Sequence, residues 1–322
     1  MKNTWAEIGK HVLILGVLAF AFFPLYVTFC ISVKNNKQFN NQPFSPLPLS
    51  GIAETFTWRP AELEAYDPQE VILAQEAQTS GLEPGDAGWP EVRQSTSATW
   101  HWENWSVAWD TVGAYIFNTI VVAVTAVFLA LIFSVSAAFF FARYHMPGTS
   151  FLWYFFLVLM LMPGVANLVP LFILLRDLNL INSLLALVII GVSGAQVVQI
   201  FILRNFIEEI PKDMFDAADV DGASALRQVM YIVLPMSGSV ISTLAILQFI
   251  AVWNDFLLPF IIMRDDSLLT LAAGLVKLDG EYVKQWGEMM AGYSIASLPL
   301  VVIFLFTMRL FVRGISAGAV KG

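Results

Sequence analysis

The fold is decided by a short polar stretch that lies between two long apolar segments. It reads Asp216-Ala217-Ala218-Asp219-Val220-Asp221-Gly222-Ala223 and runs on to Leu234-Pro235. A helix is predicted before the turn, because Pro211 suits a first helical turn and Met214, Phe215 and Ala218 recur at helical spacing. Asp221-Gly222 predicts the turn itself, because glycine tolerates the left-handed conformation in which many helices end.

A second helix is predicted directly after this turn. Ser224 is suited to cap its N-terminus, and Pro235 is expected to end it. An apolar stripe runs along it at i, i+3, i+4 and i+7, formed by Leu226, Val229, Met230 and Val233. The stretch therefore predicts two short helices joined by a sharp turn, with an apolar edge that faces outward.

The rest of the chain has the composition of a membrane protein. Of its 322 residues, 57% are hydrophobic and only 13% are charged. A run of about 20 apolar residues crosses a bilayer as a helix, and a backbone in lipid must satisfy its own hydrogen bonds. The sequence therefore predicts an all-α polytopic membrane protein with about six spans, near residues 11–33, 116–141, 151–175, 180–203, 238–263 and 290–312.

Three regions follow from these spans. Residues 1–33 are the N-terminal tail and first transmembrane helix, residues 34–110 are a long outside loop, and residues 111–322 are the transmembrane core, with the polar loop at 204–237. The first span is expected to stay uncleaved, because Val12 to Cys30 exceeds the apolar core of a signal peptide and no A-x-A site follows. The chain's one cysteine excludes a disulfide within the chain.

The outside loop carries nearly all of the chain's net charge. Residues 34–110 hold eleven acidic and four basic side chains, a net of −7 against a formal −8 for the chain, and six of the ten tryptophans. Two interpretations stay open for residues 51–98, a small cap that touches a partner or a solvated insertion. Trp102, Trp105 and Trp109 share one helical face, which favours a position at the membrane–water boundary over a ligand platform.

The polar stretch resembles the EAA loop of binding-protein-dependent ABC importer permeases. That loop has the pattern E-A-A, two residues, D-G-A, then an apolar helix that closes on L-P. Asp216 stands at the glutamate position, and Val229 replaces the usual phenylalanine. The residues that match outright are Ala217, Ala218, Asp221, Gly222, Ala223, Ile232, Leu234 and Pro235.

In this family the loop docks in a groove of the ATP-hydrolysing subunit, and the resemblance implies the same role here. The expected contact residues are Asp216, Ala217, Ala218, Asp219, Asp221, Gly222, Ala223, Leu226, Val229, Leu234 and Pro235. The alternative is an amphipathic hairpin that simply lies on its own helical bundle.

Two further stretches narrow the resemblance. Ala142-Arg143-Tyr144, followed by Met146-Pro147-Gly148, resembles the A-R-x-x-F-P-G turn of sugar-importer permeases. The ending from Gly314 to Gly322 resembles the G-L-x-A-G-x-V-K-G tail of maltose-type permeases, although by composition alone it is a flexible end. Together they imply the carbohydrate-uptake branch. The residues expected to make a tail contact are Gly318, Lys321 and Gly322.

The resemblance implies a permease subunit in a bacterial inner membrane that moves a sugar, or a related polyol or sugar phosphate, by ATP-driven alternating access. Its implied partners are a second permease, two ATP-binding cassette ATPase subunits, an extracytoplasmic solute-binding protein and membrane lipid. ATP and magnesium would be bound by the ATPase subunits, and no cofactor is expected in this chain. Both termini are expected in the cytoplasm; basic residues are nearly balanced across the two sides, so this orientation rests on the resemblance.

Polar residues inside the predicted spans are candidates for a translocation pathway. They are Gln196, Gln248, Asn254 and Asp255. Glutamines in spans more often form hydrogen bonds between helices, and a partly hydrated structural role competes for Asp255. The third span contains Met162-Pro163-Gly164, which predicts a break or kink.

Several kinds of chemistry are missing from the sequence. There is no G-x-x-x-x-G-K-[ST] phosphate loop, so the chain is not expected to be an enzyme or to hold its own ATPase site. The three histidines are far apart and there is one cysteine, which suggests no metal site. The longest polar region is acidic, which argues against nucleic acid as a partner. Two rival functions remain: an ion-gradient-driven secondary transporter that uses Asp255, and a non-transporting scaffold that uses its acidic loop.

Overall fold

The computed structural model describes residues 4–41, 43–46, 100–144, 147–161, 167–278 and 285–319. All regular structure in these ranges is helical and none of it is strand, which confirms the all-α prediction. The insertion at 51–98 lies outside the described residues, so the choice between cap and solvated loop stays open. The chain forms two compact units, Met1–Thr111 with Leu278–Ile295, and Val112–Lys277 with Ala296–Gly322.

The first unit fixes the end of the first helix by polar contacts. It contains α1 (Thr4–Ser32), α2 (Asn36–Asn41) and the first turns of α4 (Glu103–Arg143) and α14 (Trp286–Ala319). Asn104 Nδ2 donates to the carbonyl oxygens of Ser32 and Lys34 at 2.9 and 3.0 Å. The Trp286 N–H donates to Asn36 Oδ1 at 3.0 Å. These bonds tie three separate parts of the sequence together just beyond α1.

Lys34 is a buried structural residue of this junction. Its side chain is fully buried, and its Nζ donates to the carbonyl oxygens of Pro43 and Ser45 at 3.3 and 2.7 Å. Burial lowers the pKa of the Lys34 ammonium from its usual value. Gly287 passes so close that a Cβ there would lie 2.1 Å from the Lys34 carbonyl oxygen. The junction therefore has no room for a side chain at position 287.

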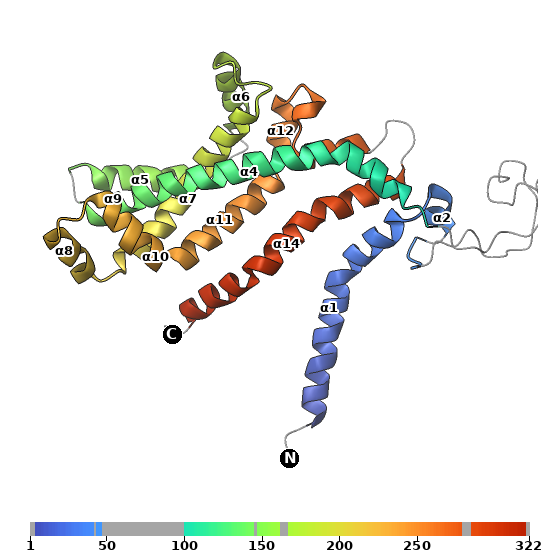
Figure 1. Ribbon diagram of the computed structural model, residues 1–322, viewed down its shortest axis with the longest axis horizontal. Coiled ribbons are helices and arrows are strands. Elements are labelled where there is room, and N and C mark those ends of the chain that lie inside the picture. Colours follow the sequence, from blue (N-terminus) through green and yellow to red (C-terminus); the bar gives the residue numbers. More distant parts are fainter. Residues whose placement is uncertain are drawn as a thin grey trace, which may run out of the picture. The chain divides into compact units, whose positions relative to one another are not determined.

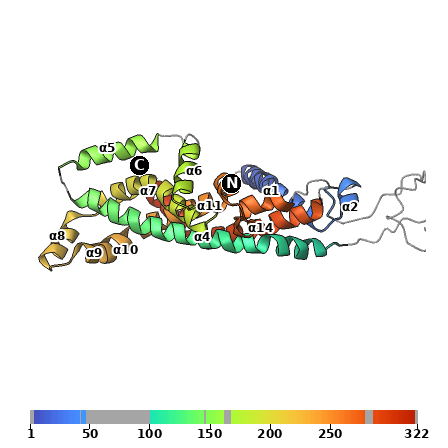
Figure 2. The same ribbon diagram turned by 90° about the horizontal axis from the view of Figure 1, so that it is seen from above.

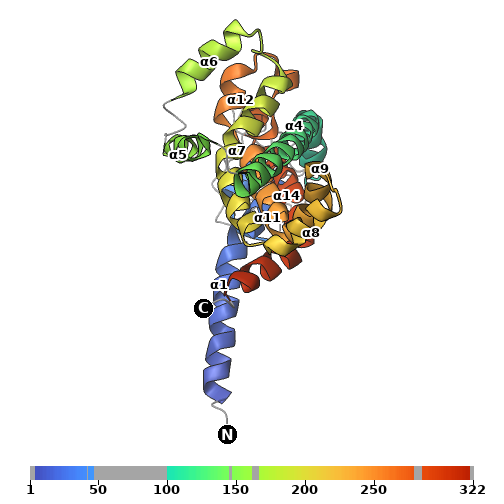
Figure 3. The ribbon, with the colours of Figure 1, turned by 90° about the vertical axis from the view of Figure 1, so that its left-hand side faces the viewer.

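The second unit holds most of the helices (Figure 1). Besides parts of α4 and α14 it contains α5 (Thr149–Met160), α6 (Leu168–Asp177), α7 (Leu184–Glu208), α8 (Lys212–Val220), α9 (Ala225–Gln228), η3 (Val229–Val233), α10 (Leu234–Met236), α11 (Gly238–Trp253), α12 (Leu257–Ile262), η4 (Asp266–Leu268), α13 (Leu271–Gly274) and all but the last residue of η5 (Leu275–Leu278). Figures 1 and 2 both place α8, α9 and α10 at the C-terminal end of α4. Figure 3, which looks at the unit from that end, shows α6 and α12 at its opposite side from α8.

A hydrophobic core joins α4, α7 and α11 to the short helices at this end. Its buried members are Val135, Ala138, Phe139, Ile200, Leu203, Ile207, Ile210, Phe215, Val233 and Leu244. A polar chain crosses the same three long helices, because Ser134 Oγ donates to Gln199 Oε1 at 2.9 Å and Gln199 Nε2 donates to Gln248 Oε1 at 2.7 Å. Each of these polar groups has a partner, as buried polar groups require. The core and the polar chain therefore hold α4, α7 and α11 together.

Four of the expected spans are single helices in the described residues. Lys10–Ser32, Glu103–Arg143, Leu184–Glu208 and Trp286–Leu305 are long and apolar enough to cross a membrane. Between Lys10 and Tyr26, α1 is exposed on every side, as expected for a helix whose neighbours are lipid.

Two expected spans are not single helices. The third, near 151–175, is divided into α5 and α6, as its Pro163 predicted, although residues 162–166 lie outside the described part. The fifth, near 238–263, was expected as one helix, and this was wrong. It ends at Trp253 and restarts as α12 at Leu257. On its other side it joins the helix Ala225–Met236 at a bend of 82°.

Candidate functional site

The first helix of the predicted hairpin is anchored by one aromatic side chain. Pro211 has φ −54° and stands directly before α8, so the helix begins where the sequence indicated. Phe215 is fully buried in the core of the second unit, with its ring centroid 6.2 Å from that of Phe139 on α4. Complete burial of a phenylalanine contributes about 1.5–3 kcal/mol. This residue therefore ties the polar stretch to the long helices.

The turn after α8 closes with two backbone hydrogen bonds. The Ala223 N–H donates to the Ala218 carbonyl at 2.8 Å, and the Gly222 N–H donates to the Asp219 carbonyl at 3.1 Å. This is the Schellman arrangement, which needs a left-handed residue after the helix. Gly222 has that conformation, with φ +69°. A Cβ added to Gly222 would meet no described atom within 4 Å, so only its backbone conformation demands glycine.

The second helix is capped as predicted but does not end at Pro235. Ser224 Oγ accepts from the Arg227 N–H at 3.5 Å. After α9 the chain widens into a π-helical turn, in which the Leu234 N–H donates to the Val229 carbonyl. Proline has no N–H to give to an α-helical ladder, and the wider turn lets the helix pass it. The expected end at Pro235 was therefore wrong, and the helix continues to Met236.

The two helices are braced by a side-chain pair. Gln228 is buried, and its Nε2 donates to Asp219 Oδ1 on the other helix. The same Nε2 lies 3.4 Å from the Ala223 carbonyl oxygen at the turn. Asp219 was predicted to share a contact with the ATPase subunit, but within this chain its carboxylate already has a partner. The pair fixes the angle between α8 and α9.

Asp216 has one charged neighbour in the described chain. Its Oδ1 lies 3.8 Å from an Arg143 guanidinium nitrogen, and the Asp216 side chain is 69% exposed. The Arg143 guanidinium also lies over the Phe215 ring, 4.1 Å from its centroid. An exposed ion pair of this length contributes little, so the Asp216 carboxylate is available to a partner.

An apolar edge faces outward from the hairpin, but it is only partly the predicted stripe: Leu226 and Met230 are exposed, whereas Val233 is fully buried in the core. Val220 is 89% exposed, Leu226 71% and Tyr231 80%. Val229 and Leu234, by contrast, pack against the core. The expected contact set therefore divides into an outward group and a group that anchors the hairpin. The tail contact stays a prediction. Lys321 and Gly322 lie outside the described residues, and Gly318 belongs to α14.

The candidate pathway residues also divide. Gln248 Nε2 donates to the carbonyl oxygens of Ala126 and Gly191 at 3.3 and 3.1 Å, so its amide joins three helices. Asn254 Nδ2 donates to the Ile250 carbonyl at 2.8 Å, on its own helix. Gln196 does not line the cavity described next. Gln248 and Asp255 do line it.

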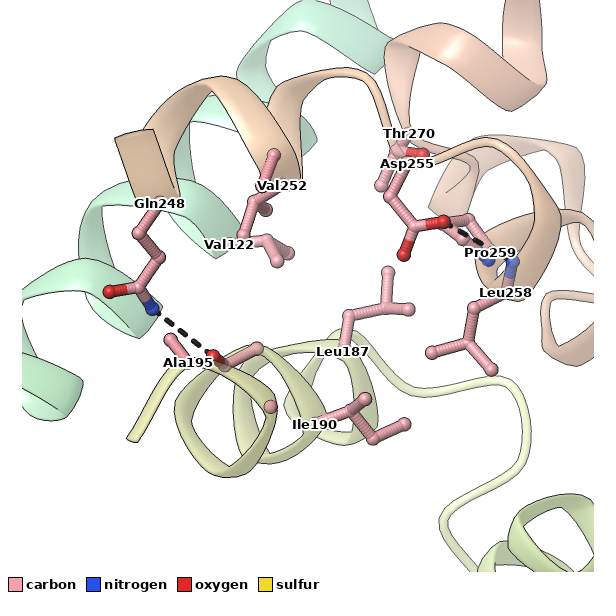
Figure 4. A pocket seen from close by; sticks show the side chains of 13 residues that line it. Val122, Leu187, Ile190, Ala195, Gln248, Val252, Asp255, Leu258, Pro259 and Thr270 are labelled. Atoms are coloured by element: carbon pink, nitrogen blue, oxygen red, sulfur yellow. Dashed lines mark hydrogen bonds between the residues drawn. The ribbon is translucent and has the colours of Figure 1, made fainter. Parts of the chain in front are cut away.

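This cavity lies among α4, α7, α11 and α12 and has a volume of about 370 Å³. Its walls include Val122, Leu187, Ile190, Val252 and Leu258. Figure 4 shows Gln248 at one end and Asp255 with Thr270 at the other, with the Asp255 carboxyl pointing into the space opposite Leu187. Among the described residues, no group of three or more His, Cys, Asp or Glu side chains could hold a metal ion.

Comparison with known proteins agrees with this architecture. Residues 130–317 match the family described as "binding-protein-dependent transport system inner membrane component". The chain belongs to this family. The permease is 32% identical over 234 residues to the probable ABC transporter permease protein YurM of Bacillus subtilis, which covers 71% of the permease and 76% of YurM.

Two further comparisons support the assignment. The permease is 30% identical over 205 residues to the arabinooligosaccharide transport system permease protein AraQ of Halalkalibacterium halodurans, over 64% of the permease and 73% of AraQ. A bacterial ABC transporter involved in the import of the acidic polysaccharide alginate has a chain of the same fold. The two share a TM-score of 0.67 over 96% of the permease and 97% of that chain, at 16% identity.

Loss of the brace is expected to loosen the hairpin of the permease. In Gln228→Leu the Asp219 carboxylate loses its hydrogen-bond donor. The hairpin should be destabilised by only about 1 kcal/mol, because water can replace part of the bond. Gln228→Glu should cost more, since it places two carboxylates together. Hydrogen exchange of the backbone amides from Ala217 to Ala223 measures the effect. The control is Arg227→Gln, which keeps the backbone contact with Ser224; equal exchange in all variants would show that the pair does not brace the hairpin.

Proposed function

We propose that the permease is the membrane-spanning subunit of an ATP-driven importer for a sugar or a related polyol or sugar phosphate. The observation that carries this proposal is the rigid, outward-facing hairpin on a helical bundle of this family. Relatives support the substrate class. One is named for arabinooligosaccharides, another for melibiose, raffinose and stachyose, another for diacetylchitobiose, and one for sulfoquinovosyl glycerol.

The proposed complex contains a second permease, two ATP-binding cassette subunits that hold ATP and magnesium, and an extracytoplasmic solute-binding protein. It lies in the bacterial inner membrane with both termini of this chain in the cytoplasm. The hairpin is the coupling element. Its outward edge of Val220, Leu226 and Tyr231 docks in a groove of the ATPase subunit, and its inner residue Phe215 carries the movement to the bundle.

The hairpin is suited to this role because it is stiff and anchored. The turn hydrogen bonds, the Ser224 cap and the Asp219–Gln228 pair fix its shape. When ATP closes the ATPase dimer, the hairpin moves as one piece. The long helices then shift between inward- and outward-open states, whose populations depend on the difference in contact energy between them.

Asp216→Lys is expected to weaken assembly with the ATPase subunit. The exposed Asp216 carboxylate would pair with a basic group of the partner; such a contact contributes about 0–1 kcal/mol if exposed and ~1.5–3 kcal/mol if shielded. Reversal of its charge adds repulsion, which salt screens. Co-purification of the ATPase subunit at low and high salt measures this. Asp177→Lys, on α6, is the control; full recovery of the ATPase with Asp216→Lys at low salt would exclude the charged contact.

Uptake in whole cells tests the function as a whole. The cells carry either the gene or its deletion, and the probes are radiolabelled arabinotriose, melibiose and diacetylchitobiose. The expected result is gene-dependent uptake of at least one of these sugars that stops when arsenate depletes ATP and survives when an uncoupler collapses the proton gradient. Uptake that survives arsenate but stops with the uncoupler would support the ion-driven transporter. Equal uptake of all three sugars with and without the gene would support the scaffold.

A further inference from the structure

The cavity among α4, α7, α11 and α12 is lined mainly by apolar and small side chains and holds one carboxylate. At about 370 Å³ it lies at the small end of the range for ligand sites, about 300–1,000 Å³. Three of its wall residues, Gly191, Gly194 and Ala195, lie within one and a half turns of α7. The space therefore owes its width to the lack of large side chains on that helix.

Packing explains one of these glycines but not the other. A Cβ at Gly191 would lie 3.0 Å from the Ala126 Cβ, so this glycine lets α7 approach α4 closely. A Cβ at Gly194 would meet no described atom within 4 Å. Glycine inside a helix costs about 1 kcal/mol relative to alanine. Gly194 is exposed, so close packing does not require its glycine, and the open space beside it keeps this part of the cavity wall accessible.

The polar groups lie together at one end of the cavity (Figure 4). Asp255 Oδ1 accepts from the Leu258 N–H at 3.5 Å, which orients the carboxyl toward the space. Next to it, Thr270 is 2% exposed, and its Oγ1 has no hydrogen-bond partner among the described residues. An unpaired buried hydroxyl costs about 1–3 kcal/mol. The Gln248 amide, at the far end, is already held by Gln199 and by backbone carbonyls.

We propose that this cavity is a binding subsite for one sugar ring of the transported solute. Asp255 would accept hydrogen bonds from ring hydroxyls, and the Thr270 hydroxyl would form a hydrogen bond with a neighbouring hydroxyl of the ring. The apolar walls would pack on the C–H face of the ring. The inference rests on the proposed sugar-import function. The subsite lies at the end of α11 remote from the hairpin, about 22 Å along the helix at 1.5 Å per residue from Gly238 to Trp253, and so in the half of the membrane remote from the ATPase.

Direct binding to the purified full-length chain in lipid nanodiscs tests the subsite without ATP or partners. The probe is methyl α-D-galactopyranoside, detected by saturation-transfer difference NMR. Cyclohexanol, which has the ring but not the array of hydroxyls, is the comparison ligand. The wild-type chain is expected to bind the pyranoside in preference to cyclohexanol. Failure to bind the pyranoside up to its solubility limit, or a stronger signal from cyclohexanol, would overturn the proposal.

Three variants locate the binding. Gly194→Leu should fill the cavity and abolish the signal, whereas Gly16→Leu on the exposed part of α1 should not. Asp255→Asn should weaken binding about tenfold or more, because a hydrogen bond to a charged group is lost. Thr270→Val should weaken binding but leave the thermal stability of the chain equal or higher. A purely structural threonine would instead lose stability, and unchanged binding in all three variants would exclude this cavity.

Sodium chloride titration separates a sugar site from a cation site. If sodium ions compete with the pyranoside for the wild-type chain, and this competition is absent in Asp255→Asn, the cavity is a cation site and the sugar proposal is overturned. The uptake experiment distinguishes failure of the subsite proposal from failure of the importer proposal. If ATP-dependent sugar uptake persists at the wild-type rate in Gly194→Leu cells, the subsite is wrong and the importer proposal stands.

Discussion

Gly222→Val is expected to stop coupled transport while the chain still inserts into the membrane. Valine is β-branched and resists the φ of +69° that the turn requires, and such a strained residue costs of order 1–3 kcal/mol. The hairpin would relieve this strain by opening the turn, so that Val220 and Leu226 lose their relative positions. Because every 1.4 kcal/mol is a factor of ten, uptake should fall by about tenfold or more.

Gly222→Asn is the matched control for this substitution. Asparagine adopts the left-handed conformation more readily than other residues with a Cβ, and the structure leaves space for a side chain at position 222. Uptake is therefore expected to survive in Gly222→Asn. Both variants are measured for membrane insertion, ATPase recovery and uptake. Wild-type uptake by Gly222→Val at normal expression would rule out a coupling role for the hairpin's shape.

Phe215→Ala is expected to have the largest effect on stability among single changes in the hairpin. Truncation of a fully buried phenylalanine typically costs about 3–5 kcal/mol. It would also remove the ring beneath the Arg143 guanidinium. The hairpin would then detach from the bundle, and uptake would be lost even where the ATPase still binds.

Limited proteolysis and uptake test this expectation. Phe215→Ala should expose the segment between Pro211 and Ala223 to cleavage, whereas Phe215→Leu should be cleaved far less, because it keeps most of the apolar volume. Met214→Ala, three-fifths buried on the same helix, serves as a further comparison. Equal protease resistance and uptake in the alanine and leucine variants would show that the Phe215 anchor does not transmit movement.

Local features of the hairpin could be predicted because they depend on neighbouring residues. Asp221-Gly222 encodes a helix end whose hydrogen bonds lie within six residues, and Ser224 caps the helix that begins beside it. The outward apolar edge was predicted only in part, because it combines Val220 on α8 with Leu226 on α9, and Val233 of the predicted stripe is buried in the core. The docking role of these residues stays a prediction, since it depends on a chain that is outside this structure.

Other features depend on contacts that spacing does not reveal. The partner of Asp219 is Gln228, a polar residue that lies outside the predicted apolar stripe, and only the fold shows that it is buried. Pro235 predicted a helix end because proline has no backbone N–H to donate. A π-helical turn lets the helix continue past it, but such a turn has no clear signal in the sequence. The cavity needs residues from four helices to come together. Of its polar groups, Gln248 and Asp255 stood out in the sequence, because polar and charged groups inside a span are unusual.

The junction beyond α1 has a consequence for the order in which the chain matures. A nascent chain emerges N-terminus first, so Lys34 and Asn36 are synthesised long before Gln285, Trp286 and Gly287. Asn36 Nδ2 donates to Gln285 Oε1 at 3.1 Å, and its Oδ1 accepts from the Trp286 N–H. The first helix can therefore enter the membrane and meet α4 early, but its contacts with α14 must wait until the last helix has been translated. A ribosome stalled before residue 285 would hold a chain whose α1 is inserted but whose junction still lacks its contacts with α14.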